Sequence, residues 1–413
     1  MSGDEAETGS RDAANACVAA LLDRRTRSTG RFFSSEAARV ARLCQRMAER
    51  FARDGRLIAV GHSPAARSDV RHVVVEFVHP VIVGKRALPA IGLTPEAGPL
   101  AARLELLAEP DDIVMAFGAG EGEGEGGARA VRDALRVARE RGCLTIAFAA
   151  AGAEWEFVPP GDDPFVHQEL TETLYHILWE LVHVFFEHRG LLEGRVASAV
   201  HDAGASSFLY PFLGQQEHDP AAVLADVRGS VGLKADEVTA LRIRTVEAAR
   251  DTLLAAAAAL RAAFAAGGSL IVFGNGGSAT DAMDLAADFR FPPQGWPSRR
   301  ALDLTEDAAV LTALANDIGP DAIFARQIIA YARPTDVALA LSTSGGSRNI
   351  LMALEEARRR GLVTIALVGY DGGRILAERL ADHVIVSPSQ HVPRIQEAQA
   401  AAYHILRELV ELS

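Results

Sequence analysis

Part of this chain occurs twice. Residues 175–182 read YHILWELV, and residues 403–410 read YHILRELV. Three further pairs match in the same order, namely 55–61 with 268–274, 134–148 with 353–367, and Gln168-Glu169 with Gln396-Glu397. A duplication of one structural unit explains all four pairs, so we expect two domains of the same architecture.

Within each copy, apolar segments of strand length alternate with helical segments. Strand candidates such as 144–148 and 363–368 are apolar throughout, which is typical of parallel strands that are covered on both faces. The predicted fold class is α/β, with two tandem doubly wound, flavodoxin-like parallel sheets and flanking helices. The predicted bounds are a partly disordered tail at 1–29, a first domain at 30–190, a linker at 191–231 that packs across both domains, and a second domain at 232–413.

Two loops of the second copy have the composition of anion-binding sites. Residues 274–278 (GNGGS) follow an apolar strand candidate and precede a predicted helix at 279–289. Residues 342–347 (STSGGS) stand at the same point between a strand candidate at 337–341 and a predicted helix at 348–360. Glycine lets the backbone approach an anion closely, and a helix N-terminus presents free N–H groups to it. Serines can also merely cap a helix, but two matched loops favour a phosphorylated small molecule.

The bulk composition argues against several function classes. There are 42 basic and 54 acidic residues, and the net charge of −12 disfavours a nucleic-acid-binding surface. No apolar run reaches the length of a membrane span, and the first residues lack the apolar core of a secretion signal. The 3 cysteines show no paired spacing, which fits a reducing compartment. We therefore expect a cytoplasmic protein that binds neither nucleic acid nor membrane.

Four segments of the second copy resemble the sugar isomerase (SIS) domain of the phosphoheptose isomerase type. They are 274–289 (GNGGSATDAMDLAADF), 304–327 (LTEDAAVLTALANDIGPDAIFARQ), 341–349 (LSTSGGSRN) and 394–411 (RIQEAQAAAYHILRELVE). The resemblance implies an aldose–ketose isomerase that converts sedoheptulose 7-phosphate to a heptose 7-phosphate through an enediol-type intermediate. It also implies a set of substrate-binding residues, which are Asn275, Gly276, Gly277, Ser278, Asp307, Ser342, Thr343, Ser344, Ser347 and Gln396.

The two copies differ at the positions where the family places metal and acid/base residues. The family pattern has His and Glu four residues apart on one helical face, where the second copy has Asp284 and Asp288. With Gln396 and His404 these aspartates form one candidate set for a divalent metal ion, zinc being one candidate. The first copy offers the alternative set His72, Glu76, Gln168 and His176. The candidate acid/base residues are His404, Asp288 and Glu76.

The first copy lacks the phosphate loops, because the glycine- and glutamate-rich run 118–127 replaces the serine loop. We therefore hypothesise a composite site between the two copies, in which the loops of the second copy hold the phosphate and His72 or Glu76 reaches into the site. One alternative is a sugar-phosphate-binding regulator or scaffold without catalysis. Another is a different SIS enzyme, such as an amino-sugar phosphate isomerase or lyase. The tandem copies predict a homodimer that forms a four-SIS-domain assembly.

Overall fold

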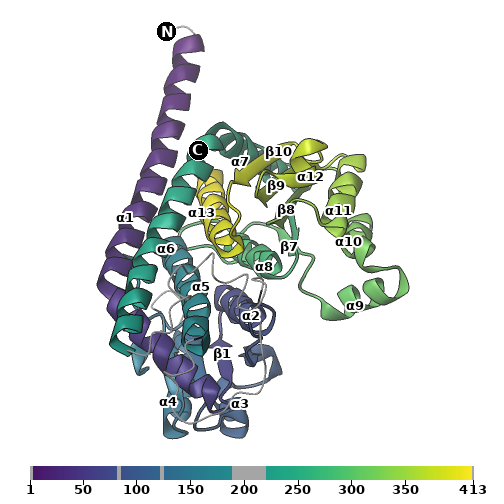
Figure 1. Ribbon diagram of the computed structural model, residues 1–413. Helices are drawn as coiled ribbons and strands as arrows, with labels where there is room; N and C mark the ends of the chain where they lie inside the picture. The colour runs from purple at the N-terminus through teal and green to yellow at the C-terminus, as the bar shows by residue number, and fades with distance from the viewer. Residues whose placement is uncertain (1–2, 81–84, 121–124, 188–219, 412–413) are drawn as a thin grey trace. The chain divides into compact units, whose positions relative to one another are not determined.

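The computed structural model describes residues 3–80, 85–120, 125–187 and 220–411, with the side chains of 3–12 and 220 left aside (Figure 1). The chain divides into two compact units. We call Thr29–Asp236 the N-terminal unit, and Met1–Ser28 together with Glu237–Ser413 the C-terminal unit. Each unit is described separately below.

The N-terminal unit is built on a five-stranded sheet with the order β2-β1-β3-β4-β5. All of its strand pairs are parallel. The strands are β1 (Leu57–Gly61), β2 (Ala90–Leu93), β3 (Ile113–Phe117), β4 (Leu144–Ala147) and β5 (Trp155–Glu156). Every residue of β1, β3 and β4 is buried, as expected for strands covered on both faces.

The sheet of the C-terminal unit has the same arrangement. Its order is β10-β9-β8-β6-β7, again with parallel pairs only. The strands are β6 (Leu270–Gly274), β7 (Ala301–Asp303), β8 (Val337–Ser342), β9 (Val363–Gly369) and β10 (His383–Ser387). If the strands of each unit are numbered one to five along the chain, both sheets have the order 2-1-3-4-5. The two units therefore have the same topology. The predicted duplication and the α/β fold class are confirmed.

Helices cover both faces of each sheet. In the N-terminal unit they are α2 (Pro64–Val78), α3 (Leu100–Leu107), α4 (Glu125–Glu140) and α5 (Pro164–Glu187), with a short 3-10 helix η1 (Pro95–Ala97). One core packs parts of α2 and α5 against one sheet face, and a second packs α3 and α4 against the other. In the C-terminal unit, α7 (Arg250–Ala265), α8 (Gly277–Arg290) and α13 (Val392–Glu411) cover one face, and α10 (Ile323–Tyr331) and α11 (Arg348–Arg359) cover the other. The remaining elements there are α9 (Ala308–Asp317), η5 (Pro320–Ala322) and α12 (Gly373–Ala377).

The beginning of the chain differs from the expected tail. Residues Gly3–Ala52 form one helix, α1, whose first part belongs to the C-terminal unit. Val18, Leu21 and Leu22 of this helix are buried in the core that also holds residues of α7 and α13. The Arg25 guanidinium, also buried, donates to the Glu408 carboxylate at 2.8 Å. Apolar burial and this ion pair therefore attach a segment whose first residues look only polar in sequence.

The predicted linker is only partly described. Residues 191–219 of it lie outside the described residues, while 220–231 form the beginning of helix α6 (Pro220–Ala248). Within the described residues, no helix combines the length and the apolarity that crossing a membrane requires.

Candidate active site

The two predicted phosphate loops lie next to each other in the C-terminal unit. Strands β6 and β8 are neighbours, and Gly274 at the end of β6 is in register with Leu341 in β8. Because parallel strands present their carboxyl ends at one sheet edge, the loops that follow them share that edge. The first loop opens α8 and the second opens α11. The side chain of Ser278 is buried in the first turn of α8.

A pair of side-chain amides joins the two loops. The Asn275 Nδ2 donates to Asn349 Oδ1 at 2.9 Å, and the Asn349 Nδ2 donates back to Asn275 Oδ1 at 2.9 Å. Asn349 was not among the predicted site residues. The signal that could have found it is its place at the end of the segment LSTSGGSRN, as the second residue of the helix that the serine loop opens.

The hydroxyl groups of the serine loop are used in different ways. Ser342 Oγ accepts from the Gly345 N–H at 3.1 Å, and Ser344 Oγ accepts from the Gly346 N–H at 3.3 Å. Ser347 holds the N-cap position of α11, yet its side chain makes no capping hydrogen bond within the described chain. Helix capping therefore does not account for Ser347. Thr343 lies in the same loop, and its carbonyl oxygen accepts from the Gly369 N–H at 3.0 Å.

Two other predicted substrate-binding residues lie on helices. Asp307 is the N-cap of α9, where one carboxylate oxygen accepts from the N–H groups of Ala309 and Val310 at 2.9 and 3.1 Å. Its predicted contact with sugar hydroxyls stays a prediction. Gln396 is buried near the beginning of α13, the helix that also carries His404.

Two predicted acid/base residues, His404 and Asp288, come together with the predicted metal ligand Asp284 between α8 and α13. His404 Nε2 lies 3.3 Å from Asp284 Oδ2 and 3.3 Å from Asp288 Oδ2. The Tyr403 hydroxyl donates to the same Asp284 oxygen at 2.9 Å. Burial, followed by the charge of Asp284, raises the pKa of Asp288 to about 6. A carboxyl group whose pKa lies near neutrality can both take and give a proton.

Arg407 supports this cluster from the next turn of α13, and no motif in the sequence singles it out. Its Nε donates to the Asp288 carbonyl oxygen at 3.2 Å, and its guanidinium lies 4.6 Å from the ring centroid of Phe289 and 4.8 Å from that of Trp296. Burial lowers the pKa of Arg407, and the Glu411 carboxylate at 2.7 Å opposes that effect. The arginine fixes the end of α8 against α13.

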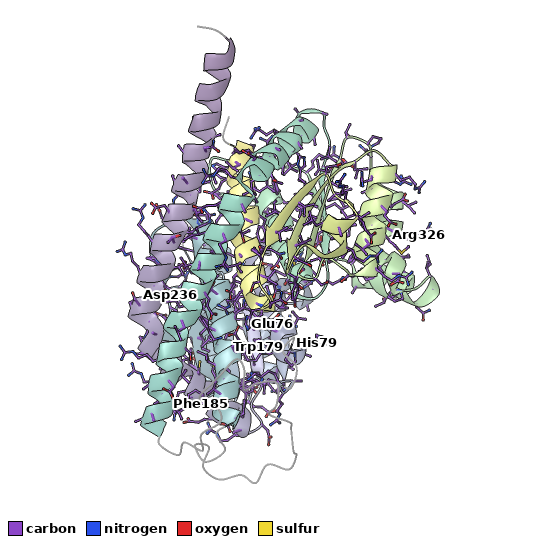
Figure 2. The ribbon with its side chains drawn as sticks, turned by 45° about the horizontal axis from the view of Figure 1, so that its top comes forward. Glu76, His79, Trp179, Phe185, Asp236 and Arg326 are labelled. Carbon is purple, nitrogen blue, oxygen red and sulfur yellow. The ribbon has the colours of Figure 1, made fainter. Side chains whose placement is uncertain are left out.

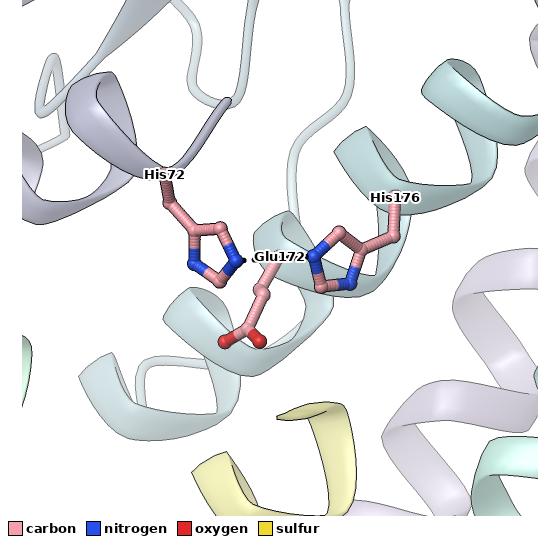
Figure 3. Close-up of side chains that lie close together, drawn as sticks. All are labelled: His72, Glu172 and His176. Atoms are coloured by element: carbon pink, nitrogen blue, oxygen red, sulfur yellow. Dashed lines mark hydrogen bonds between the residues drawn. The ribbon is translucent and has the colours of Figure 1, made fainter. Parts of the chain in front are cut away.

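The N-terminal unit brings His72 of α2 and His176 of α5 together (Figure 3). Their Nε2 atoms are 3.3 Å apart, and a carboxylate oxygen of Glu172 lies in the same cluster, within 4.8 Å of both rings. Glu76 lies 3.9 Å from His72, and Gln168 Nε2 donates to Glu172 Oε2 at 3.4 Å. Glu172 was missed, although it stands one helical turn before His176 and one after Gln168. Residues 121–124 of the glutamate-rich run lie outside the described residues.

The N-terminal cluster fits a tetrahedral metal ion. Two ligand atoms bonded to zinc at about 2.0–2.1 Å lie about 3.3–3.4 Å apart, and the two imidazole nitrogens have that separation. Burial, and then the neighbouring His176, lower the pKa of His72 and keep its ring in the neutral form that binds metals. The cluster of Asp284, Asp288 and His404 also has ligand-like spacing. Its two carboxylates suit a harder cation, and one of their oxygens already accepts from Tyr403.

The two clusters occupy equivalent places in the two units. In both, one residue of the helix after the first strand meets a histidine of the long last helix at 3.3 Å, as His72 with His176 and Asp284 with His404. The alignment of the repeats is thus reproduced in three dimensions. The units differ in chemistry, because one has a pair of imidazoles where the other has a carboxylate and an imidazole.

Comparisons with known proteins agree with this geometry. A family model described as "SIS domain" matches residues 235–369. A phosphoheptose isomerase of Solidesulfovibrio magneticus is 42% identical over 43% of this chain and 85% of its own length. One of Pelobacter propionicus is 46% identical over 38% of this chain and 82% of its own length.

A solved structure extends the likeness in fold to both units. The C-terminal domain of glucosamine-fructose-6-phosphate aminotransferase from Francisella tularensis has a TM-score of 0.57 and covers 95% of this chain and 94% of its own, at 10% identity. At that identity the likeness concerns the fold alone. The family model and the two relatives above identify this chain as a member of the SIS-domain family of sugar-phosphate isomerases, with phosphoheptose isomerases among its relatives.

Proposed function

We propose that this protein interconverts sedoheptulose 7-phosphate and a heptose 7-phosphate, an aldose–ketose isomerisation in the C-terminal unit. The observation that carries the proposal is that one helix joins two functions. Helix α8 begins at the glycine loop and carries Asp284 and Asp288, which face His404. At about 1.5 Å per residue, Asp284 lies about 9 Å along the helix from Ser278. An open-chain heptose phosphate is long enough to place its phosphate at the loops and its reacting carbons near this cluster.

The chemistry needs one group that moves a proton between adjacent carbons. A base removes a proton from the hydroxyl-bearing carbon beside the carbonyl group while the carbonyl oxygen takes up a proton, which gives an enediol. A proton is then delivered to the former carbonyl carbon while the neighbouring hydroxyl releases one, and exchange of the base with water between the two steps admits deuterium. His404 and Asp288 are the candidates in the C-terminal unit, and the raised pKa of Asp288 suits the task. Glu76 remains the candidate of the N-terminal unit under the composite hypothesis. Serine hydroxyls and loop N–H groups would hold the phosphate in place meanwhile.

A decisive test uses the purified full chain, assayed for metal content, with sedoheptulose 7-phosphate in deuterated water. We expect an aldoheptose phosphate with deuterium at the reacting carbon, detected by NMR and mass spectrometry. Absence of product and of exchange, with divalent cations supplied and binding of the sugar phosphate demonstrated, would replace this proposal by the regulatory binding protein. Turnover of an amino-sugar phosphate instead would point to the other SIS enzymes.

We also propose that His72, Glu172 and His176 hold a divalent metal ion, with zinc as the best fit to two imidazoles and one carboxylate. Such an ion would polarise substrate oxygens if the composite arrangement exists. The chain purified with zinc should contain about one ion per chain, and His176→Ala should lose most of it. Metal content is measured by mass spectrometry after dialysis. The matched variant His167→Ala, on the same helix α5 but half-buried near its beginning and outside the cluster, should keep its zinc. Equal loss in both variants contradicts the assignment. The homodimer remains a prediction.

A further inference from the structure

A cavity of about 390 Å³ opens at the edge of the C-terminal sheet opposite to the phosphate loops. Its lining includes Ser269, Arg300 and Asp336, each the residue immediately before a strand, namely β6, β7 and β8. The cavity therefore lies at the amino ends of these strands, whereas the phosphate loops follow their carboxyl ends. Four arginines line it, which are Arg290, Arg299, Arg300 and Arg333.

Two of the arginines are held by carboxylates. The Arg290 guanidinium lies 3.1 Å from Glu306, and that of Arg299 lies 2.9 Å from Glu411. The other two are exposed, and among the described residues no carboxylate forms an ion pair with Arg300 or Arg333. The cavity thus has two arginines that are paired with carboxylates and two, Arg300 and Arg333, that are not. Arg300 also donates from Nη1 to the Gly267 carbonyl oxygen at 3.0 Å, which leaves its other N–H groups for a ligand.

Among the described residues, the acidic residue of the lining, Asp336, forms no ion pair with these arginines. Asp336 is buried, and its two carboxylate oxygens accept from the backbone N–H groups of Ser269 and Arg333, each at 2.8 Å. This carboxylate joins the segment before β6 to the segment before β8. These two hydrogen bonds to the backbone account for the position of the Asp336 side chain.

The N-terminal unit shows what the same sheet edge looks like without the arginines. Three hydrogen bonds at this edge of the sheet occur at corresponding positions in the two units. Leu57 N–H donates to the Pro89 carbonyl as Leu270 N–H does to that of Arg300, and Leu88 N–H donates to Phe77 as Arg299 N–H does to Phe289. Likewise, Glu109 N–H donates to Asp112 as Arg333 N–H does to Asp336. Where the C-terminal unit has Arg290, Arg299, Arg300 and Arg333, the N-terminal unit has Val78, Leu88, Pro89 and Glu109.

One side chain also occupies this edge in the N-terminal unit. Arg56, which corresponds to Ser269, forms an ion pair with Asp112 at 2.8 Å and approaches Glu109 at 3.7 Å. Its guanidinium also donates to the Leu107 carbonyl at 2.7 Å. In that unit the charges are matched within the protein itself. In the C-terminal unit Ser269 stands where Arg56 stands in the N-terminal unit, and Arg333 stands where Glu109 does. The cavity at this edge is therefore open and basic.

We propose that this cavity binds an organic phosphate, separately from the substrate site. Arginine forks match phosphate oxygens two at a time, and Arg300 and Arg333 would supply them. The ring of Tyr331, 48% exposed, also lines the cavity and offers a flat apolar face for a base or a sugar. The volume lies within the range of small-molecule sites. A nucleoside diphosphate combines a flat ring with a dense negative charge, and it is the ligand class that this lining fits best.

The experiment titrates ADP into the full chain by calorimetry and compares variants. The first variant, Ser269→Arg with Arg333→Glu, installs the residues that the N-terminal unit accommodates at the same places. We expect it to weaken ADP binding at least about tenfold, since two guanidinium–phosphate contacts are lost or blocked. The control Arg326→Glu repeats the arginine-to-glutamate substitution at an exposed position of α10 outside the lining (Figure 2) and should leave ADP binding unchanged. A second variant, Arg300→Gln, is milder and should also weaken binding.

Further arms separate the sources of a signal. ADP binding should persist in Ser344→Ala, Ser347→Ala, which alters only the serine loop, and the double variant with Ser269→Arg should still bind sedoheptulose 7-phosphate. Inorganic phosphate should bind more weakly than ADP. The proposal is overturned if the wild-type chain does not bind ADP, or if inorganic phosphate binds as tightly as ADP. It is also overturned if both cavity variants, Ser269→Arg with Arg333→Glu and Arg300→Gln, bind ADP like wild type. Loss of ADP binding in the serine-loop variant alone would place ADP at the serine loop and overturn it as well. Circular dichroism verifies that each variant is folded.

Discussion

Replacing His404 by glutamine should lower kcat by about 10²–10⁴-fold, the usual contribution of a positioned acid or base. His404 is fully buried between Asp284 and Asp288, at 3.3 Å from each, and it is the imidazole of that cluster. Glutamine keeps a polar side chain of similar length but cannot carry a proton between substrate atoms. Steady-state kinetics on sedoheptulose 7-phosphate measures the effect, and thermal unfolding verifies that the variant is folded. Asp288→Asn, which preserves shape, is a second variant that should also lower kcat.

The matched comparison for His404 lies in the other unit. The double variant His72→Ala, Glu76→Gln changes the residues through which the N-terminal unit would take part. If the site is composite, this variant also loses most of its kcat. If it retains full activity, catalysis belongs to the C-terminal unit and the composite hypothesis is wrong. An unchanged kcat in His404→Gln would contradict the acid/base assignment itself.

Gly345→Ala should disable the serine loop, whereas Gly346→Ala should not. Gly345 has a φ of +60°, a left-handed conformation that costs a residue with a Cβ about 1–2 kcal/mol. A Cβ there would also lie 2.5 Å from the Gly372 carbonyl oxygen, so the backbone must move. Because the loop N–H groups and Ser347 would then shift, we expect KM to rise by more than about tenfold, each tenfold corresponding to about 1.4 kcal/mol of binding.

Gly346 provides the control at the next position. The nearest atom to a Cβ at Gly346 is a Ser344 oxygen at 3.9 Å, an ordinary contact. Gly346→Ala should therefore keep its KM within about twofold, and its unfolding temperature should stay close to that of wild type. Equal KM values for the two variants would mean that the serine loop does not hold the substrate phosphate.

The strands and the loops that follow them could be predicted because they depend on local pattern. Buried parallel strands are apolar throughout, and the glycine and serine loops appear as short motifs between strand and helix. The repeat then fixed the correspondence of His176 with His404, which meet equivalent partners in the structure. Here the sequence and the structure carry the same information, since each feature depends on residues close together in the chain.

Residues that act across long separations could not be predicted in this way. Asn349 and Arg407 lie on predicted helices, and their roles depend on Asn275 and Asp288, which are distant in sequence. Glu172 lies on the face of α5 that carries His176, but only the position of His72 makes it part of a cluster. The attachment of residues 13–28 depends likewise on Glu408 and on the cores of α7 and α13. Pairing of this kind is decided by the tertiary fold.

The amide pair of Asn275 and Asn349 has a consequence for the way the site meets its ligand. Two loops that were free to move would each lose rotamer and backbone freedom on binding a phosphate, at a cost of about 0.5–1.5 kcal/mol for each side chain immobilised. The reciprocal hydrogen bonds at 2.9 Å restrict both loops before any ligand arrives. Part of the ordering is therefore completed during folding. An anion would enter a preorganised binding site, and the affinity of that site would depend on two amides that need not touch the anion.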